Sequence, residues 1–343
     1  MRMIAAERRA AGALAGIYAL RMLGLFLVLP VLALAARDLS GATPVLVGLA
    51  IGIYGLTQAA LQVPFGFASD RLGRKRVIAF GLLLFAAGSA LAAVADSIAL
   101  LIVGRALQGA GAIAAALMAL AADLTRDGVR TRVMALIGIS IGASFSAALV
   151  IGPVFHAWFD LAGLFWLATA LALVALALLY TVVPTPRAVA AHRDATPVAS
   201  QFRAVLASRP LLRLDAGIFV LHLVMTGTFV AAPLALEGAG LAEASHWEIY
   251  LPVFGGSVAL MGPLIMLAER RERTKAVFLG AVALVAAAHA VLALAGGGLL
   301  GIGLGLLIFF TGFNVLEATL PALVSRCAPA AHKGTAMGVY SAS

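Results

Sequence analysis

The sequence contains little cysteine, little charge and few acids. Cys327 is the only cysteine among 343 residues, which excludes an internal disulfide and a cysteine-based metal site. Charged residues make up only 11% of the chain, whereas 63% of the residues are hydrophobic, and the mean hydropathy is +1.07. These values exclude an ordinary soluble domain and indicate a protein with several membrane spans.

The acids are outnumbered, because 15 Asp and Glu stand against 24 Lys and Arg, giving a formal net charge of +9. In a soluble protein this imbalance would suggest a nucleic-acid partner. Here all but three of the 24 bases lie at the N-terminus or in every second loop between apolar runs, the exceptions being Arg21, Arg37 and Arg105. By the positive-inside rule we expect the N-terminus and these loops to be cytoplasmic, and we expect no nucleic-acid partner.

Ten apolar runs are long enough to cross a hydrocarbon layer of ~30 Å as helices. They cover about 12–36, 45–68, 77–95, 97–122, 133–158, 161–183, 211–236, 247–268, 275–295 and 298–325. Residues 334–343 begin like an eleventh helix and stop before they could cross. The first run is too long for the apolar part of a signal peptide, so we interpret it as a span. The expected fold class is an all-α, polytopic membrane helical bundle with ten complete spans and the start of an eleventh.

The longest polar stretch, residues 184–210, contains several prolines and charges of both signs. We interpret it as a cytoplasmic linker between an N-terminal six-helix half, residues 1–183, and an incomplete C-terminal half, residues 211–343. Basic loops at 70–76 and 269–275 follow the second and eighth runs. This spacing is expected for two repeats related by an axis along the membrane normal.

A polar segment separates the second and third runs, with the sequence Gly66-Phe67-Ala68-Ser69-Asp70-Arg71-Leu72-Gly73-Arg74-Lys75-Arg76. Its two glycines permit a tight reversal of the backbone, and its single acid among four bases suits a short cytoplasmic loop. The segment resembles the G-x-x-x-D-R-x-G-R-(K/R) signature between the second and third helices of the major facilitator superfamily. The alternative interpretation is an ordinary basic loop that follows the positive-inside bias.

In that family the acid of the signature faces the start of helix eleven when the cytoplasmic side is closed. The resemblance therefore implies that Asp70 meets the positive end of a helix and stabilises one conformational state. Asp123, at the end of the fourth run, is a candidate counter-ion for Arg74. The expected conformational latch comprises Gly66, Asp70, Arg71, Gly73, Arg74, Arg76 and Asp123.

Several further stretches resemble one branch of this family. Residues 20–24 with 28–32, 51–59, 104–109 and 333–341 are similar to the YajR-like branch of proton-driven drug efflux transporters in Gram-negative bacteria. Members of that branch have the major facilitator fold with twelve helices and a small soluble C-terminal domain. The resemblance therefore implies that this chain is C-terminally truncated.

Six polar side chains lie well inside apolar runs, where an ionisable group is costly and is therefore a functional candidate. They are Arg21, Arg105, His222, His289, Asn314 and Glu317. Arg21 lies near the middle of the first run, so snorkelling is the less favoured interpretation. Arg105 and Gln108 share one face of the fourth run. Arg105 and Gly109 resemble the family's R-x-x-x-G motif, whose arginine is implicated in proton coupling.

The fifth run carries a second partial match. Gly142, Gly152 and Pro153 resemble the family's antiporter signature, although Ala148 and His156 stand where that signature has glycines. The resemblance implies an antiporter.

The C-terminal half offers candidates for proton transfer. His222 changes charge near physiological pH, which suits proton handling, but a hydrogen-bonded packing role is an equally good interpretation. Glu317 is predicted to be the only acid within a span, with Asn314 one turn before it on the same face. A carboxylate in an apolar setting with an arginine nearby can bind and release a proton. We expect the proton-coupling site or substrate cavity to contain Arg21, Arg105, Gln108, His222, Asn314 and Glu317.

The predicted function is proton-coupled export of small amphiphilic compounds by alternating access. The alternatives are a proton symporter or facilitator for a polar nutrient and a non-transport membrane assembly subunit. An enzyme is disfavoured because the sequence shows no metal constellation and no Ser/His/Asp grouping at one membrane depth. We expect no cofactor and no metal, a monomer that contacts membrane lipid, a small-molecule substrate with protons, and a multi-pass location in the bacterial inner membrane.

Overall fold

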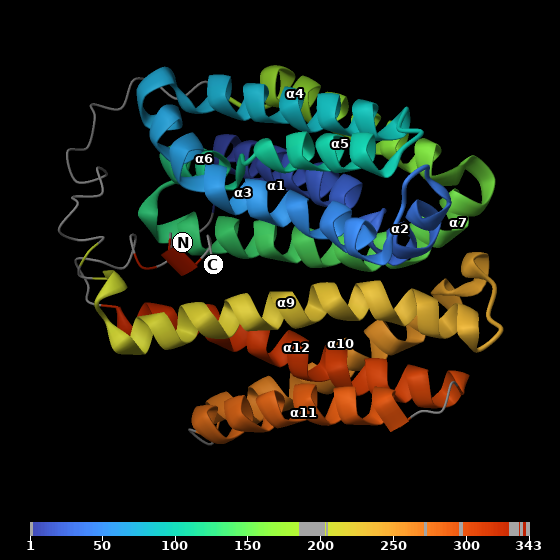
Figure 1. Ribbon diagram of the computed structural model, residues 1–343. Helices are drawn as coiled ribbons and strands as arrows, with labels where there is room; N and C mark the ends of the chain where they lie inside the picture. The colour runs from blue at the N-terminus through green and yellow to red at the C-terminus, as the bar shows by residue number, and fades with distance from the viewer. Residues whose placement is uncertain are drawn as a thin grey trace. The chain divides into compact units, whose positions relative to one another are not determined.

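The computed structural model of this chain describes residues 3–184, 203, 205–270, 273–294, 298–328, 336 and 339–340. The chain divides into two compact units, Met1–His192 and Arg193–Ser343. Both units consist of helices (Figure 1), and within the described residues nine segments are long and apolar enough to cross a membrane. Residues 185–202 and 204 of the predicted linker lie outside the described part, as does most of the predicted start of an eleventh helix.

The first unit is built around long helices that pack side by side. Its helices are α1 (Ala5–Phe26), α2 (Leu29–Ala35), α3 (Pro44–Leu72), α4 (Arg74–Ala93), α5 (Ile98–Ala110), α6 (Ala114–Asp123) and α7 (Asp127–Thr181). Helix α7 packs against α1 and α4, and α5 packs against α3 and α4. The bend between α1 and α2 precedes Pro30, which lacks the N–H needed to continue the helical hydrogen bonds.

The polar segment 66–76 is not the loop that the sequence predicts. Helix α3 continues to Leu72 and α4 begins at Arg74, so Gly73 is the single residue between the two helices. Gly73 has φ = 94°, a conformation that costs glycine little and other residues more. Gly66 is helical and does not take part in the turn. The reversal therefore depends on Gly73 alone.

The fourth predicted span is interrupted rather than continuous. Helix α5 ends at Ala110 and α6 begins at Ala114, and Gly111 between them has ψ = 51°. A Cβ atom on Gly111 would touch the Gly81 carbonyl and Phe85 of α4, so the break also lets α4 approach closely. Residues 111–113 thus place non-helical backbone in the middle of an apolar segment.

Helix α7 contains the fifth and sixth predicted runs in one segment. At 1.5 Å per residue its 55 residues would span about 80 Å as a straight helix, far more than a bilayer. The helical dihedrals are interrupted at Asp160, which has φ = 55° and ψ = −174°, and the ribbon turns back on itself (Figure 1). Ser144 before this point bonds the Ala19 carbonyl of α1, whereas Thr169 after it bonds the Ala86 carbonyl of α4.

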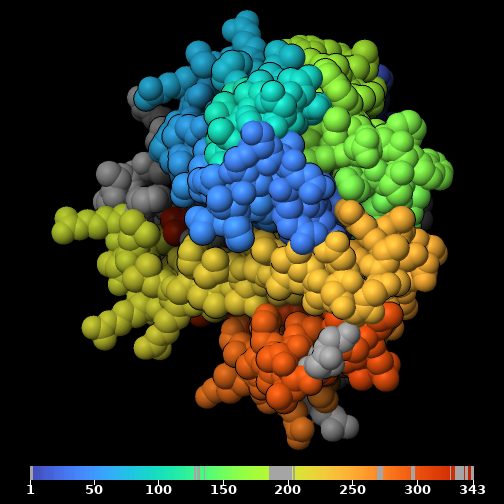
Figure 2. Space-filling view, turned by 45° about the vertical axis from the view of Figure 1, so that its right-hand side comes forward, coloured from blue at the N-terminus to red at the C-terminus, as the bar shows by residue number. Residues whose placement is uncertain are grey.

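The second unit is organised around its last long helix. Its helices are α9 (Arg209–Gly238), α10 (Trp247–Arg270), α11 (Thr274–Leu294) and α12 (Leu299–Cys327), with a short 3₁₀ helix at Glu243–Ser245. Helix α12 packs against α9, α10 and α11. Figure 2 shows long side chains projecting at the beginning of α9, where Arg209 and Arg213 are exposed.

Large apolar side chains lie exposed on several helices of both units. Trp158 is 74% exposed, Leu294 is 85% exposed and Phe80 is 57% exposed. A water-soluble protein rarely tolerates so much exposed apolar surface, whereas a surface that contacts lipid requires it. The exposed side chains therefore agree with the spanning lengths of the helices.

Candidate functional site

Arg21 lies in the interior of the first unit and bonds to the backbone at the break between α5 and α6. Its side chain is only 1% exposed, and its Nη2 donates to the Gly111 carbonyl at 3.0 Å, to Gln58 Oε1 at 2.8 Å and to Tyr54 Oη at 3.1 Å. The carbonyl of Gly111 lies where the hydrogen bonds of α5 end. The Gly111 carbonyl also accepts from the Ile113 N–H at 2.9 Å, so Arg21 adds a second donor and joins α1 to the break between α5 and α6.

Arg105, on α5, is equally buried and lies close to the same tyrosine. Its Nη1 donates to Gln108 Oε1 at 2.6 Å, its Nε donates to the Ala50 carbonyl at 3.2 Å, and its guanidinium lies 4.9 Å from the centre of the Tyr54 ring. The position over the ring face is a cation–π contact. Tyr54 therefore contacts both buried arginines.

Gln108 extends the network towards α4. Its Nε2 donates to Ser89 Oγ at 2.7 Å, and Ser89 in turn donates to the Phe85 carbonyl at 2.7 Å. The two helices come this close because Gly88 has no side chain, since a Cβ there would collide with the backbone of Gln108 and Gly104. The predicted pair Arg105 and Gln108 is thus one end of a continuous chain of hydrogen bonds.

The two buried guanidinium groups have no acidic partner among the described residues. Arg21 Nε and Nη1 are buried without a hydrogen-bond acceptor there, and the Arg21 guanidinium lies 5.6 Å from the Phe85 ring centre. Burying a charge without a counter-ion is costly. The first unit therefore stores two positive charges in its interior, which marks these arginines as functional candidates.

Tyr54 and Gln58 complete this cluster, although they were not among the predicted site residues. Tyr54 Oη donates to Gln58 Oε1 at 2.6 Å, and both accept from Arg21. They stand four residues apart on α3 and therefore share a helix face. That spacing of polar groups within an apolar run was the signal that could have identified them.

In the second unit the structure brings His222 and Glu317 together. His222 Nε2 of α9 lies 3.9 Å from Glu317 Oε2 of α12, and the two side chains are 44% and 46% exposed. His222 Nδ1 lies 3.1 Å from the Ile218 carbonyl, which orients the ring with Nε2 towards the carboxylate. The pair thus joins an imidazole of α9 to a carboxylate of α12.

Asn314 does not join this pair, contrary to the predicted common face. Its Nδ2 donates to Ser257 Oγ of α10 at 3.0 Å, whereas Glu317 approaches α9. Residues three apart on a helix differ in direction by about 60°. On α12, which contacts several neighbours, this difference is enough to send the two side chains to different helices.

The prediction that Glu317 is the only acid within a span is wrong. Asp215 lies on α9, within a candidate span, and its side chain is only 6% exposed. Neither of its carboxylate oxygens has a hydrogen-bond partner among the described residues. Asp215 belongs to the predicted run 211–236, near the beginning of that run.

The basic segment after α3 is held by Arg74, which bridges three helices. Arg74 forms an ion pair with Asp70 one turn earlier on α3, donates from Nη1 to Ser69 Oγ at 2.7 Å, and pairs through Nε with Asp123 Oδ2 of α6 at 3.2 Å. Arg71 and Arg76 are exposed. The predicted partner of Asp70 at the start of helix eleven lies mostly outside the described residues.

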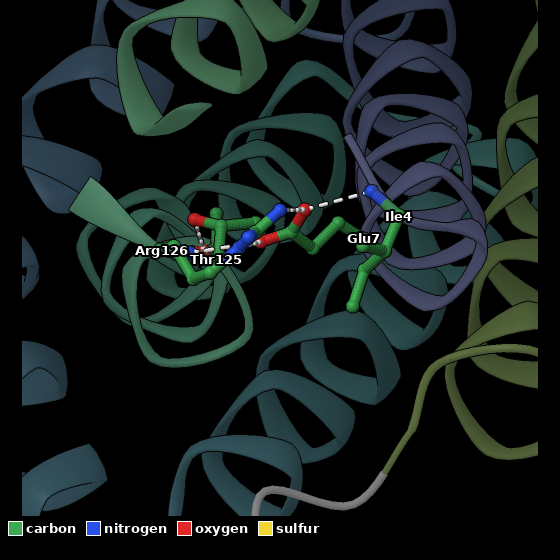
Figure 3. A network of polar contacts seen from close by, with 5 residues as sticks. Ile4, Glu7, Thr125 and Arg126 are labelled. Atoms are coloured by element: carbon green, nitrogen blue, oxygen red, sulfur yellow. Dashed lines mark hydrogen bonds and ion pairs between the residues drawn. The ribbon is translucent and has the colours of Figure 1, made fainter. Parts of the chain in front are cut away.

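A second charged contact joins the beginning of α1 to the beginning of α7 (Figure 3). Glu7 is 4% exposed; it accepts from Arg126 Nε at 2.7 Å and from Arg126 Nη2 at 2.9 Å, and it also accepts from the backbone N–H of Ile4. The bonded Glu7 carboxylate raises the pKa of the Arg126 guanidinium above its ordinary value. This bidentate pair was missed because Arg126 was interpreted only as one of the loop bases.

The residues of the partial antiporter match do not act alike. Gly152 and Pro153 are buried, and a Cβ atom on Gly152 would press on the Leu27 carbonyl and on Pro30 at the bend after α1. Gly142 is exposed, and a Cβ atom added there would meet nothing within 4 Å. Gly152 therefore has a packing role within the first unit, and Gly142 makes no comparable contact among the described residues of that unit.

Comparison with known proteins identifies the family. The sequence model described as Major Facilitator Superfamily matches residues 14–343. The chain belongs to the major facilitator superfamily. Members of this superfamily are transporters, so the protein is a multi-pass membrane transporter of small molecules and not an enzyme.

Named relatives are similar over most of the chain. The "Inner membrane transport protein YajR" of Escherichia coli strain K12 is 47% identical over 342 residues, covering 100% of this chain and 75% of that protein. The "Multidrug resistance protein MdtH" of Yersinia enterocolitica is 29% identical over 261 residues, covering 74% of this chain and 62% of that protein. A bacterial homologue of the human lysosomal transporter Spinster, solved inward-facing and occupied, has a TM-score of 0.78 at 13% identity, covering 99% of this chain and 79% of that chain. The last similarity concerns the fold.

Proposed function

We propose that this major facilitator transporter exports small amphiphilic compounds in exchange for protons. The observation that carries the proposal is the pair of His222 and Glu317, whose facing atoms are 3.9 Å apart while both side chains remain about half exposed. A carboxylate that is partly exposed can meet protons and ligands, and a nearby imidazole can share its charge changes.

The chemistry of exchange follows from competition for one carboxylate. An ionised Glu317 attracts either the protonated His222 ring or a cationic group on a substrate. A proton bound to Glu317 removes that attraction. Because the same oxygen atoms cannot serve a proton and a cation equally well at one time, proton uptake favours release of the substrate.

The surroundings of the pair support an amphiphilic substrate. Phe313 stands edge-on to the His222 ring with the ring centres 5.9 Å apart, and Phe310 and Phe309 continue the aromatic cluster along α12. Aromatic faces with a few polar groups suit compounds that carry an apolar body and a charge. The multidrug name of the MdtH relative supports the same substrate class.

We propose an orientation with the N-terminus and the Arg74 segment on the cytoplasmic side of the bacterial inner membrane. The positive-inside distribution supports this orientation, and the name of the YajR relative supports the membrane. We also infer that α7 crosses twice, which gives ten crossings within the described residues. The non-helical Asp160 lies beside Trp158, Phe159 and Trp166, which are 50% exposed or more, as expected for aromatic residues at a membrane interface.

The residues Asp70, Arg74 and Asp123 are proposed to hold the cytoplasmic side in its closed state. The two ion pairs of Arg74 tie the end of α3, the beginning of α4 and the end of α6 into one rigid unit. A rigid unit can transmit a conformational change as a whole, whereas separate helix ends would move independently.

A proton symporter for a polar nutrient is the competing function. The two buried guanidiniums of Arg21 and Arg105 favour it, because they lack acidic partners among the described residues and suit the recognition of polar or anionic groups.

The direction of flux relative to the proton gradient separates the two functions. Inverted membrane vesicles with an acidic interior are mixed with ethidium, a fluorescent amphiphilic cation. An exporter that exchanges ethidium for protons accumulates the dye inside, and nigericin, which collapses the pH difference, abolishes the accumulation. Accumulation that nigericin leaves unchanged, or none above vesicles without the protein, would refute proton-coupled export.

A further inference from the structure

Asp215 is a buried acid that the proposed exchange at Glu317 does not use. It lies on α9 with 6% of its side chain exposed, and both carboxylate oxygens lack hydrogen-bond partners within the described part of the chain. A carboxylate in such surroundings is strongly disfavoured in its charged form unless a proton or a cation joins it. We therefore expect the Asp215 carboxylate to hold either a proton or a cation.

The position of Asp215 on α9 relates it to the proposed exchange pair. Asp215 precedes His222 by seven residues, which is two helical turns, so both side chains leave the same face of the helix about 10 Å apart along its axis. Helix α9 is close to α12 at this level, since a Cβ atom on Gly217 would lie 3.6 Å from the Leu320 side chain. Asp215 thus lies nearer the N-terminal end of α9 than the pair of His222 and Glu317 does.

Tyr340 is a further buried polar residue of the second unit. Its side chain is 7% exposed, and its hydroxyl, like the Asp215 carboxylate, has no hydrogen-bond partner among the described residues. The second unit therefore contains two buried polar side chains without partners among the described residues, Asp215 and Tyr340, besides the half-exposed pair of His222 and Glu317.

We propose that Asp215 is a second proton-binding carboxylate, which passes protons between the start of α9 and Glu317. The other titratable groups of the second unit that the proposed path involves are Glu317 on α12, Tyr340, and His222 on α9 itself, while Arg209 and Arg213 are exposed at the start of α9. A proton bound to Asp215 removes the cost of burying its charge, and in the proposed relay the Tyr340 hydroxyl, which can both donate and accept, carries the proton to Glu317. The relay rests on the proposed proton-coupled export. The proposal that Asp215 binds a proton is independent of that export.

Infrared spectroscopy tests the bound proton directly and needs no substrate. Purified protein in liposomes is titrated with pH, and the carbonyl stretch of protonated carboxylic acids is recorded in H₂O and D₂O. We expect the spectrum of Asp215→Asn to lose a carboxylic-acid band that the parent keeps at neutral pH. The matched control is Glu248→Gln, at the exposed first turn of α10, which should keep that band. Identical neutral-pH spectra for Asp215→Asn and the parent would overturn the proposal.

Transport then tests the relay separately. With ethidium in inverted vesicles, Asp215→Asn should lose accumulation driven by a pH difference while it keeps exchange of ethidium for ethidium, which needs no net proton movement. Asp215→Glu should restore the accumulation, because it restores the acid. If Asp215→Asn accumulates ethidium like the parent, the relay is refuted. A parent that shows the infrared band but no accumulation refutes the proposed export and leaves the Asp215 proton site standing.

Discussion

Replacing Gln108 by leucine should destabilise the first unit more than any other change of one amide. Gln108 is fully buried, with 0% of its side chain exposed. It accepts a hydrogen bond from Arg105 Nη1 at 2.6 Å and donates one to Ser89 Oγ at 2.7 Å. Leucine has a similar volume, so Gln108→Leu removes both bonds while it creates little empty space.

The size of the effect follows from the two lost bonds. A hydrogen bond from a charged donor contributes about 1.5–3 kcal/mol, and a neutral one contributes about 0.5–1.5 kcal/mol. Because Arg105 is only 1% exposed, water cannot replace the lost acceptor. We expect the free energy of unfolding of the unit to fall by about 2–4 kcal/mol. At about 2–4 °C per kcal/mol for a unit of this size, the midpoint should fall by about 5–15 °C.

Gln62→Leu is the matched control on α3. Gln62 is 7% exposed, and its Oε1 is buried without a partner among the described residues, so leucine removes an unpaired polar atom rather than a bond from that oxygen. The same substitution should therefore leave the midpoint nearly unchanged or raise it.

Tryptophan fluorescence during heating in detergent provides the assay. Trp158 and Trp166 lie in the first unit and the remaining tryptophan, Trp247, lies in the second, so a Trp247→Phe background confines the signal to the first unit. Equal midpoints for Gln108→Leu and Gln62→Leu would refute the reasoning, because they would mean that the Arg105 network does not stabilise the unit.

Three further perturbations test other parts of the structure. Gly73→Ala should lower the thermal midpoint, since alanine is strained at φ = 94°. Gly66→Ala should be tolerated, because its Cβ atom would meet Ala115 at an ordinary contact distance of 3.7 Å. Thermal melts of the two variants test this difference. Glu7→Gln should lower the midpoint at neutral pH and lose its effect in strong acid: the raised pKa keeps Arg126 charged at every working pH, so the pair fails only when Glu7 is protonated. Equal differences between Glu7→Gln and the parent at both pH values would contradict this sign. Asp70→Asn should make a cysteine probe on the cytoplasmic side of the cavity more reactive without changing substrate preference, and unchanged reactivity would remove the proposed latch.

The positions of the long helices followed from the sequence because apolar length is a local property. The predicted runs at 211–236 and 275–295 match α9 and α11 to within a few residues. Asp160, where the helical dihedrals stop, falls in the short gap between the fifth and sixth runs. A membrane-spanning helix needs a long, unbroken apolar segment, and the length of such a segment can be counted directly in the sequence.

The places where helices are interrupted, and the partners of the polar side chains, depend on tertiary contacts. These features could therefore not be predicted from the sequence. Glycine occurs at 104, 109 and 111, and the helix stops at the last of these, where Arg21 bonds the Gly111 carbonyl and Gly81 approaches closely. The segment before Gly73 remains helical, and Arg74, the first residue of α4, pairs with Asp70 of that segment and with Asp123 of α6.

Most charged residues of the candidate site were predicted from the sequence, whereas two uncharged ones were missed. Arg21, Arg105 and Glu317 stand out in an apolar sequence, whereas Tyr54 and Gln58 are uncharged, and their spacing of four residues is a weaker signal than a charge. Asp215 was overlooked although it belongs to the predicted run 211–236, because the criterion for candidates selects only side chains well inside a run.

The most direct test of proton exchange at Glu317 is the release of protons when a substrate binds. Purified protein in weakly buffered detergent solution receives ethidium while a pH indicator reports free protons. The parent should release protons on binding, because substrate and proton compete for the Glu317 carboxylate, and Glu317→Gln should bind ethidium without releasing them. Equal proton release from Glu317→Gln and the parent would contradict exchange at this carboxylate.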